Sequence, residues 1–188
     1  KSMVSDILYY AKDRVPSWET VSAAELAEDV VSMMESRARE LEVAFSLEIE
    51  APPGDLDADP QAVRALLANL VENSLDACRL HKACQGRRVV LRVEGEPDRV
   101  RFEVEDDGIG MDRETREKAF SLFFSSKGTG TGLGLFISDK IARAHGGAIE
   151  LESEPGVGTR FIVSLPRTKP PEEELPDTPM LKGSTIHA

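Results

Sequence analysis

The segment that most restricts the fold is a long amphipathic helix predicted for residues 60–82. Asp59 can cap its first turn, and Pro60 suits the first helical position. One face of this helix is apolar and needs a second layer to cover it. That face consists of Val63, Leu67, Leu70, Val71, Leu75 and Cys78. The opposite face is polar and carries Asn69, Glu72, Asn73 and Asp76.

The aspartates before this helix allow a second interpretation. Asp55, Asp57 and Asp59 alternate as they do at the start of a calcium-binding loop. Such a loop needs glycine at its sixth position and a bidentate glutamate at its twelfth. This chain has Pro60 and Leu66 at those positions, so we favour the start of a helix over a calcium site.

The remaining pattern predicts a two-layer α/β sandwich. Ser22 begins another helix, and Glu25 completes its capping box. A third helix is predicted for residues 133–145 and ends at Gly146. Alternating apolar residues predict strands at 43–49, 87–94, 99–105, 148–153 and 159–165. About three helices grouped against a mixed, mostly antiparallel sheet give this fold class.

Composition limits the number of domains and the kinds of partner. A chain of 188 residues is one domain with appendages. The net charge of −11 argues against nucleic acid, because binding to phosphate backbones requires a basic surface. Cys78 and Cys84 form neither a disulfide framework nor a zinc spacing, which is typical of a reduced, cytoplasmic protein. No apolar run is long enough for a membrane span, and we expect no membrane contact.

The two ends of the chain differ from its centre. Residues 1–14 have apolar positions at helical spacing, and Pro16 ends that run. Residues 167–188 are rich in Pro and Glu without any period, which predicts a disordered linker or tail. The main domain is therefore expected at residues 20–166. Because the first residue is Lys1 and not Met, we expect an excised piece of a longer protein.

Two asparagines suggest a ligand site on the polar face of the helix at 60–82. A solvated face is the ordinary interpretation of such a stripe. Asn is a weaker helix former than Lys, Glu or Gln, however, and a merely solvated face would favour those residues. The amide oxygens of Asn69 and Asn73 are neutral, hard ligands that suit magnesium already carrying phosphate.

A second candidate site follows the strand at 99–105. Asp106 and Asp107 precede Gly108, Ile109 and Gly110, a composition that is also typical of a β-turn. A carboxylate at a strand end can only accept hydrogen bonds, and the glycines let a flat ligand approach the backbone. Asp106 would therefore accept a hydrogen bond from the amino group of adenine and repel the oxygen that guanine carries there.

A third candidate is the run SSKGTGTGLGL at residues 125–135, with glycine at every second position from 128 to 134. It matches neither the P-loop nor the dinucleotide-binding spacing. A flexible linker is the simplest alternative. The run leads directly into the helix at 133–145, however, and bare N–H groups at a helix start attract phosphate. We therefore expect a phosphate-binding loop that can also act as a lid.

Together these motifs resemble the boxes of one ATP-binding domain. NLVENSLDA, which contains Asn69 and Asn73, resembles an N box, and FSLFFSSK at residues 120–127 resembles an F box. DDGIG at 106–110 and GTGLGL at 130–135 resemble the two glycine boxes. Over residues 20–166 the chain is similar to the catalytic domain of bacterial sensor histidine kinases, within the gyrase, chaperone, histidine kinase and MutL superfamily. The resemblance implies the Bergerat-type fold and binding of Mg-ATP.

The resemblance also implies a role for each matching residue. Asn73 would bind Mg2+, and Asn69 would help to place metal, water or phosphate. Asp106 would bind adenine in a pocket lined by Gly108 and Gly110, with Thr159 nearby. Phosphates would be held by Lys127 and by Gly130, Thr131, Gly132, Leu133 and Gly134, and Phe123 would anchor the lid. Asn69, Asn73 and Lys127 would then be the catalytic residues.

Two departures from the family pattern affect the mechanism. We also place Asp76 at the nucleotide, but many members have Lys or Arg at this position. Asp76 cannot offset the negative charge of the phosphates, so Lys127 would have to provide more of that interaction. MutL-type ATPases have a Glu at the position of Asn69, and that Glu prepares water for attack. Because Asn cannot act as a base, transfer to a histidine is favoured over hydrolysis.

The resemblance further implies partners outside this chain. Residues 1–19 would be the remnant of a dimerisation hairpin whose first helix carries the phosphoacceptor histidine. The intact protein would be a homodimer that phosphorylates its own or its partner's histidine and passes the group to a response regulator receiver domain. His81, His145 and His187 are not in an acceptor motif, and His145 is interpreted as a helix-end residue in a favourable dipole position. The alternatives are an ATPase switch and a nucleotide-binding pseudokinase scaffold.

Overall fold

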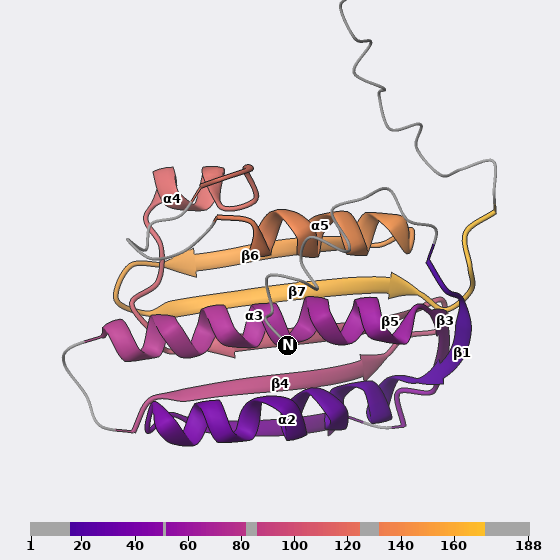
Figure 1. The fold of residues 1–188 in the computed structure, drawn as a ribbon, viewed down its shortest axis with the longest axis horizontal. Helices are drawn as coiled ribbons and strands as arrows, with labels where there is room; N and C mark the ends of the chain where they lie inside the picture. The colour runs from indigo at the N-terminus through magenta and orange to yellow at the C-terminus, as the bar shows by residue number, and fades with distance from the viewer. Residues whose placement is uncertain (1–15, 51, 82–85, 125–131, 172–188) are drawn as a thin grey trace, which may run out of the picture.

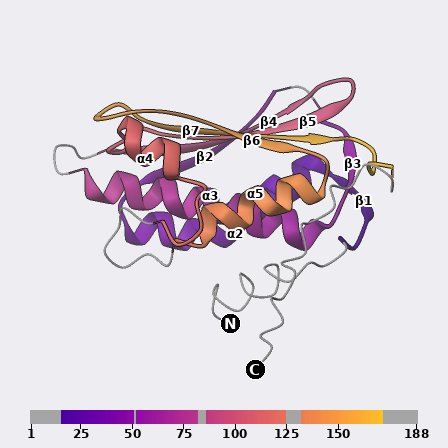
Figure 2. The same cartoon turned by 90° about the horizontal axis from the view of Figure 1, so that it is seen from above.

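The computed structural model describes residues 16–50, 52–81, 86–124 and 132–171. A five-stranded sheet forms one layer, and helices cover one of its faces (Figures 1 and 2). The strand order is β2 (Ala44–Glu50), β4 (Arg88–Gly95), β5 (Arg99–Asp106), β7 (Gly158–Pro166) and β6 (Ala148–Glu154). The β2–β4 pair is parallel, and the three other neighbouring pairs are antiparallel. The predicted two-layer α/β sandwich is confirmed.

Three helices form the second layer: α2 (Ala23–Glu40), α3 (Pro60–Leu80) and α5 (Gly134–Ala144). Figure 1 shows α3 in the middle, with α2 and α5 on either side of it. The predicted caps are present, because Ser22 accepts a hydrogen bond from the Glu25 N–H and Asp59 accepts from the first turn of α3. Local sequence signals therefore set where these helices begin.

The core lies between the helices and the sheet. All six residues of the predicted apolar face of α3 are buried. On the sheet, the inward positions of β4, β5 and β7 are apolar and buried, whereas charged side chains follow the outer face of β4 and β5. This alternation is typical of an antiparallel sheet with one face in the core and the other in water.

Three short elements were not predicted. Strand β1 (Glu19–Ser22) pairs with β3 (Asp55–Ala58), and the Thr20 hydroxyl donates to Asp57 over 2.8 Å. The alternating aspartates are thus a strand followed by a helix cap. A short helix after β5, α4 (Arg113–Lys118), has no buried residue. Elements of four to six residues are too short for hydrophobic periodicity to reveal them.

The C-terminal boundary lies later than expected. Arg167 donates hydrogen bonds of 2.8 Å to the carbonyl groups of Pro53, Asp55 and Glu96. Disorder beginning at residue 167 is therefore wrong for this residue, because its guanidinium is held by three backbone carbonyls from two separate segments of the chain. The expected helix at 1–14 and the tail from residue 172 lie outside the described residues. Within the described part of the chain, no helix has both the length and the apolar composition needed to cross a bilayer.

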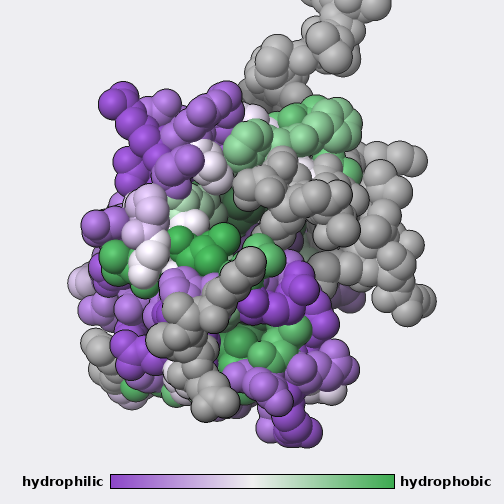
Figure 3. All heavy atoms as spheres, turned by 90° about the vertical axis from the view of Figure 1, so that its left-hand side faces the viewer, coloured by the Kyte–Doolittle hydropathy of each residue, from purple (hydrophilic) through white to green (hydrophobic). Residues whose placement is uncertain are grey.

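The candidate site segments meet at one end of the molecule. In Figure 1, β5 ends, α5 starts and α3 ends on the left-hand side, where α4 also lies. Figure 3 faces this end and shows apolar side chains between hydrophilic ones. The large apolar side chains exposed on these segments include Leu80, Ile109, Leu122, Phe123 and Val157. A surface with both apolar and polar groups suits a ligand that is partly flat and partly charged.

Candidate functional site

Asp106, the last residue of β5, provides a buried carboxylate at this end of the sheet. The residue is only 4% exposed. Its Oδ1 accepts the Gly108 N–H over 2.9 Å, so one oxygen is used by the turn. Its Oδ2 is buried and makes no hydrogen bond of good geometry within the described residues, although the Ser74 hydroxyl and the Thr159 N–H lie near enough to the carboxyl to favour its charged form. An unpaired buried acceptor is costly, and it is a ready partner for a ligand N–H.

Burial raises the pKa of Asp106 to about 6, against the hydrogen bonds that favour its charged form. The carboxylate is therefore held in an environment that penalises its charge. A ligand that donates a hydrogen bond to Oδ2 would relieve part of this penalty. Asp106 is thus poised for an uncharged donor such as an aromatic amino group.

The loop after Asp106 is fixed from two sides. Ile109 N donates to the Ala77 carbonyl of α3, and Gly156 N donates to the Ile109 carbonyl. Gly110 has φ +64°, and a Cβ at this position would overlap the Glu154 carbonyl. Only glycine therefore allows the loop to lie against the β6–β7 turn. Gly110 thus has a steric reason to be glycine, and its place in an adenine pocket stays a prediction.

Thr159 lies directly opposite Asp106 on β7 and is buried. Its hydroxyl is 3.0 Å from the hydroxyl of Ser153, which in turn accepts the Met111 N–H. This small network joins β6, β7 and the loop that follows Asp106. Thr159 therefore lies beside Asp106, and its place in a nucleotide pocket stays a prediction.

Asn69 and Asn73 lie on the half-exposed face of α3, but their amide groups have protein partners. The Asn69 Nδ2 donates to the Ser138 hydroxyl of α5 over 2.9 Å. Its Oδ1 lies so close to Gly134 that a Cβ on Gly134 would overlap it. The Asn73 Nδ2 donates to the Asn69 carbonyl over 2.9 Å, which fixes the orientation of the Asn73 amide. Asn69 thus tethers α3 to the start of α5, and Asn73 lies one turn further along.

The other two residues of the polar face turn toward α2. Glu72 accepts a hydrogen bond from Arg37 Nε over 3.1 Å, and Asp76 lies 3.8 Å from both Arg37 and Arg79. Asp76, predicted at the nucleotide, is therefore part of an ion-pair cluster between α2 and α3. Sequence reasoning did not find Arg37, because its partners are 35 and 39 residues away.

The start of α5 has the properties of an anion site. Its N-cap residue, Leu133, makes no side-chain capping hydrogen bond, so the first-turn N–H groups lack that partner. The Gly132 carbonyl accepts the Phe123 N–H over 3.1 Å, which joins the two ends of the loop. Phe123 is 72% exposed and does not anchor the segment by burial. Its role as the anchor of a lid stays a prediction, because residues 125–131 of that lid lie outside the described residues.

Several predicted site residues lie outside the described residues. They are Lys127, Gly130 and Thr131, together with Gly128. Their assignment to the phosphates stays a prediction.

Sequence reasoning missed the contacts of Asp107, the residue that follows Asp106. Asp107 accepts the Arg88 N–H through Oδ1, and its carbonyl accepts a hydrogen bond from Arg87. The Cys78 thiol lies 3.7 Å from Asp107, and burial raises the pKa of this thiol to about 12. Cys78 is therefore a packing residue and not a nucleophile. No sequence signal separated Asp107 from an ordinary turn residue.

His145 corrects a further expectation. It is buried beside Trp18, and its Nε2 accepts the Asp59 N–H over 3.0 Å. Its Nδ1 is 2.7 Å from the Ile141 carbonyl, so the neutral tautomer protonated at Nδ1 satisfies both partners. Burial lowers the pKa of His145 below its ordinary value. His145 is the C-cap of α5, so its predicted helix-end position is confirmed. It ties α5 to the start of α3 as a neutral group, however, and therefore adds no positive charge to the end of the helix dipole.

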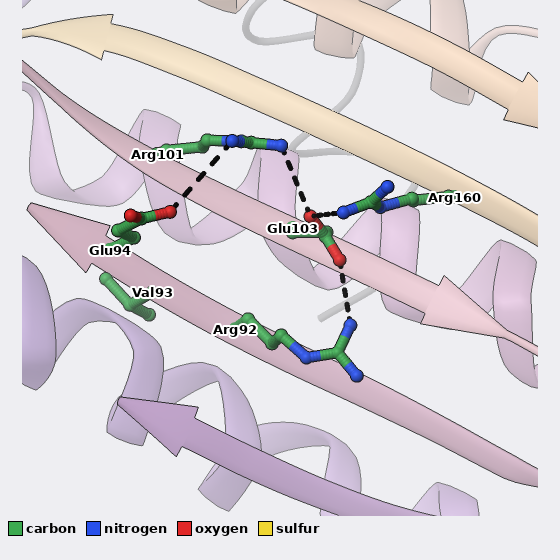
Figure 4. A pocket seen from close by; sticks show the side chains of 6 residues that line it. All are labelled: Arg92, Val93, Glu94, Arg101, Glu103 and Arg160. Carbon is green, nitrogen blue, oxygen red and sulfur yellow. Dashed lines mark hydrogen bonds and ion pairs between the residues drawn. The ribbon is translucent and has the colours of Figure 1, made fainter. Parts of the chain in front are cut away.

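The outer face of the sheet has a separate cavity of about 230 Å³, lined by charged residues (Figure 4). Glu103 points into it and forms ion pairs with Arg92, Arg101 and Arg160. Burial acts to raise the pKa of Glu103, but hydrogen bonds from Arg160 and Arg92 leave it below the ordinary value. Because its charges already satisfy one another, this cavity is a solvated ion-pair network and not the candidate site.

Comparison with known protein families identifies the family of this domain. Residues 58–169 match the model of the histidine kinase-, DNA gyrase B- and HSP90-like ATPases. This chain belongs to that ATPase family. Within the family it is a catalytic, ATP-binding domain of the sensor histidine kinase type. Among its relatives, the signal transduction histidine-protein kinase AtoS of Escherichia coli is 28% identical over 87% of this chain and 26% of its own length. The sensor histidine kinase ZraS of Klebsiella oxytoca is 30% identical over 87% of this chain and 35% of its own length.

Solved structures of the same ATPase family have the same fold. The catalytic domain of the histidine kinase ThkA is 30% identical, with a TM-score of 0.71 over 81% of this chain and 99% of that domain. Full-length ShkA in complex with AMPPNP is 27% identical, with a TM-score of 0.77 over 89% of this chain and 36% of that protein. ThkA in complex with the response regulator TrrA has a TM-score of 0.73 at 30% identity, over 89% of this chain and 47% of that protein. This chain thus spans about a quarter to a third of the AtoS and ZraS sequences.

Proposed function

We propose that this chain binds Mg-ATP and presents the γ-phosphoryl group to a histidine on a dimerisation helix. The observation that carries the proposal is the buried, unpaired Oδ2 of Asp106 beside a loop that only glycine can form. Adenine offers a flat ring and an exocyclic amino donor, which match these two features. Guanine would bring a carbonyl oxygen to the same carboxylate, so the pocket selects adenine.

The triphosphate would lie between the polar face of α3 and the start of α5. Asn69 holds these two helices together through Ser138, and the first turn of α5 has no side-chain cap. Its N–H groups and the positive end of the helix would contact phosphate oxygens. Lys127 and the backbone from Gly130 to Gly134 would complete the phosphate contacts as the lid closes.

The residues present also fit a magnesium ion bound together with phosphate. The Asn73 Nδ2 donates to the Asn69 carbonyl, so Oδ1 is the amide atom suited to a metal. The described residues include no group of three or more His, Cys, Asp or Glu side chains that could hold a metal ion, so phosphate and water would supply the other ligands. When bound, Mg2+ neutralises charge on the transferring phosphoryl group.

In the proposed transfer, an imidazole nitrogen of the acceptor histidine attacks the γ-phosphorus. The bond from this phosphorus to the bridging oxygen of ADP breaks, a phosphorus–nitrogen bond forms, and ADP leaves. The chain's own residues position the nucleotide and stabilise charge. Asn69 has an amide and not a carboxylate, so it cannot prepare water for attack, which favours transfer over an ATPase switch.

The experiment is calorimetric titration of the chain with Mg-ATP and Mg-GTP. Wild-type protein should prefer ATP by more than tenfold, which is about 1.4 kcal/mol, the size of one charge-assisted hydrogen bond. Asp106→Asn should remove most of this preference, because a rotated amide can accept from adenine or donate to guanine. Asp107→Asn, which changes the neighbouring carboxylate, is the control and should keep the preference. Equal binding of both nucleotides to wild-type protein would contradict the adenine assignment.

The same proposal includes partners beyond this chain. A homodimer would bring each catalytic domain to an acceptor helix, and a response regulator receiver domain would accept the phosphoryl group. The complex of ThkA with its response regulator TrrA supports this part of the proposal. A nucleotide-binding scaffold without transfer is the alternative, and it predicts ATP binding without any phosphohistidine.

A further inference from the structure

Arg37 of α2 reaches across to the face of α3 that carries Asn73. Its Nε donates to Glu72 over 3.1 Å, and its Nη2 lies 3.8 Å from Asp76. These two carboxylates are one residue before and three residues after Asn73. Residues three apart are neighbours on a helix surface, so these contacts place the guanidinium on the α2 side of the helix turns that carry Asn73.

The guanidinium of Arg37 makes one short hydrogen bond and two longer ion-pair contacts. The Nε contact is a hydrogen bond, whereas the Nη1 contact to Glu40 and the Nη2 contact to Asp76 measure 3.5 and 3.8 Å. The side chain is 39% exposed. Arg has five donors in a planar fork that matches phosphate oxygens. Its two terminal nitrogens can therefore gain better hydrogen bonds without loss of the Nε contact.

The local charge gives a reason for such a rearrangement. Glu72 and Asp76 place two negative charges on the face where a triphosphate is proposed to bind. Without a nearby cation these carboxylates would repel the nucleotide. Arg37 lies between them and offsets that repulsion. Its position is thus explained by the nucleotide as well as by the contact between α2 and α3.

We propose that Arg37 is a phosphate-binding residue that Glu72 and Asp76 hold beside Asn73 until the nucleotide arrives. On binding, the terminal nitrogens turn from Asp76 and Glu40 toward the β- and γ-phosphates, while Nε keeps its bond to Glu72. The cation for this side of the triphosphate is thus supplied by α2. This inference rests on the proposed function, because it needs the triphosphate near Asn73.

The chain contains a matched control for this ion pair. Arg64 of α3 donates from Nε to Asp29 of α2 over 2.7 Å, so it also joins the two helices. Arg64 is nine residues before Asn73, or about 13 Å along the helix at ~1.5 Å per residue. Loss of Arg64 should therefore affect the contact between α2 and α3 without affecting the phosphates.

The test compares the affinities for Mg-ATP, Mg-ADP and AMP in wild-type protein, Arg37→Ala and Arg64→Ala. In Arg37→Ala, ATP affinity should fall about tenfold, ADP affinity less, and AMP affinity by less than twofold. Arg64→Ala should leave all three within about twofold of wild type. Arg37→Lys, which keeps the charge but loses the fork, should show an intermediate loss for ATP. Melting temperatures measured in parallel show whether each variant is folded.

A second variant separates phosphate binding from a structural role. Asp76→Asn removes a negative charge and releases Nη2, so it should raise the ratio of ATP to AMP affinity by about threefold. If Asp76 itself held the nucleotide, the same variant would lower ATP affinity. Equal losses for ATP, ADP and AMP in Arg37→Ala, or no loss, would overturn the role of Arg37 while the proposed function stands. Failure of wild-type protein to bind ATP would overturn both proposals.

Discussion

Asp106→Asn should stabilise the nucleotide-free protein at neutral pH and at the same time weaken its binding of ATP. In the folded protein the pKa of Asp106 is about 6, against an ordinary value of 3.8. Because the folded pKa is raised, the folded state binds more protons than the unfolded state between these two values. This contribution to stability is therefore lost as the pH rises through that range.

The size of the effect follows from the same two values. A difference of about two pKa units at 1.36 kcal/mol each gives a cost of about 3 kcal/mol for the ionised carboxylate at pH 8, and about 1 kcal/mol at pH 4.5. Asn has the same shape, carries no charge, and can still accept the Gly108 N–H, but its NH2 group would replace the oxygen that faces the Ser74 and Thr159 donors, which offsets part of the gain. We expect Asp106→Asn to raise the unfolding free energy by about 1–3 kcal/mol at pH 8, or roughly 4–10 °C in melting temperature.

The assay is urea unfolding of wild type, Asp106→Asn and Asp107→Asn at pH 4.5 and pH 8 without nucleotide. The gain for Asp106→Asn should shrink by about 2 kcal/mol at the lower pH. Asp107 is 36% exposed and accepts the Arg88 N–H, so Asp107→Asn should not stabilise the protein. A loss of stability in Asp106→Asn at pH 8, or a gain that does not depend on pH, would refute the reasoning.

Three further predictions test other parts of the site. The pKa of His145 is lowered by burial, so the stability that its neutral form contributes is present above pH 6.5 and is lost as the pH falls. In urea unfolding, the difference in unfolding free energy between wild type and His145→Gln should therefore shrink between pH 7.5 and pH 5. The Cβ of Gly110→Ala would overlap the Glu154 carbonyl, so this variant should lower the unfolding free energy by about 2 kcal/mol or more and abolish ATP binding. Gly156 has a similar φ but open space around it, so Gly156→Ala should lower the unfolding free energy by about 1 kcal/mol and leave ATP binding intact. Urea unfolding and calorimetric titration of both variants check this. Asn73→Ala should reduce Mg-ATP affinity at least tenfold with little change in melting temperature, and equal affinity would contradict the metal assignment.

The helices and the central sheet could be predicted because each repeats a pattern over many residues. The apolar face of α3 spans 21 residues and has a cap at its first turn, so both its position and its buried side were readable. The strands β4 and β5 alternate over eight residues each. By contrast, β1 and β3 have four residues each, and their pairing depends on contacts across 37 residues of chain. Such long-range pairing has no local signal.

The candidate site was predictable in composition but not in its connections. Asp106, Asn73 and the loop glycines were identified from their types and spacing. The Asn69–Ser138 hydrogen bond and the reach of Arg37 to Asp76 join residues on different helices, which one sequence does not place together. The neutral protonation state of His145 was also missed, because a helix-end position alone does not reveal that the ring is buried and accepts the Asp59 N–H. Burial and partners, and not residue type, decide its charge.

The measurement that tests the central claim most directly is incubation with radiolabelled Mg-ATP, followed by acid and base treatment of the protein. The chain alone should bind ATP but acquire no acid-labile, base-stable label. A fusion that places a dimerisation hairpin with an acceptor histidine before residue 1 should acquire that label, and Asn73→Ala should abolish it. Label on the chain alone would mean that His81, His145 or His187 is an acceptor. ATP binding without label in the fusion would contradict phosphoryl transfer and favour a nucleotide-binding scaffold.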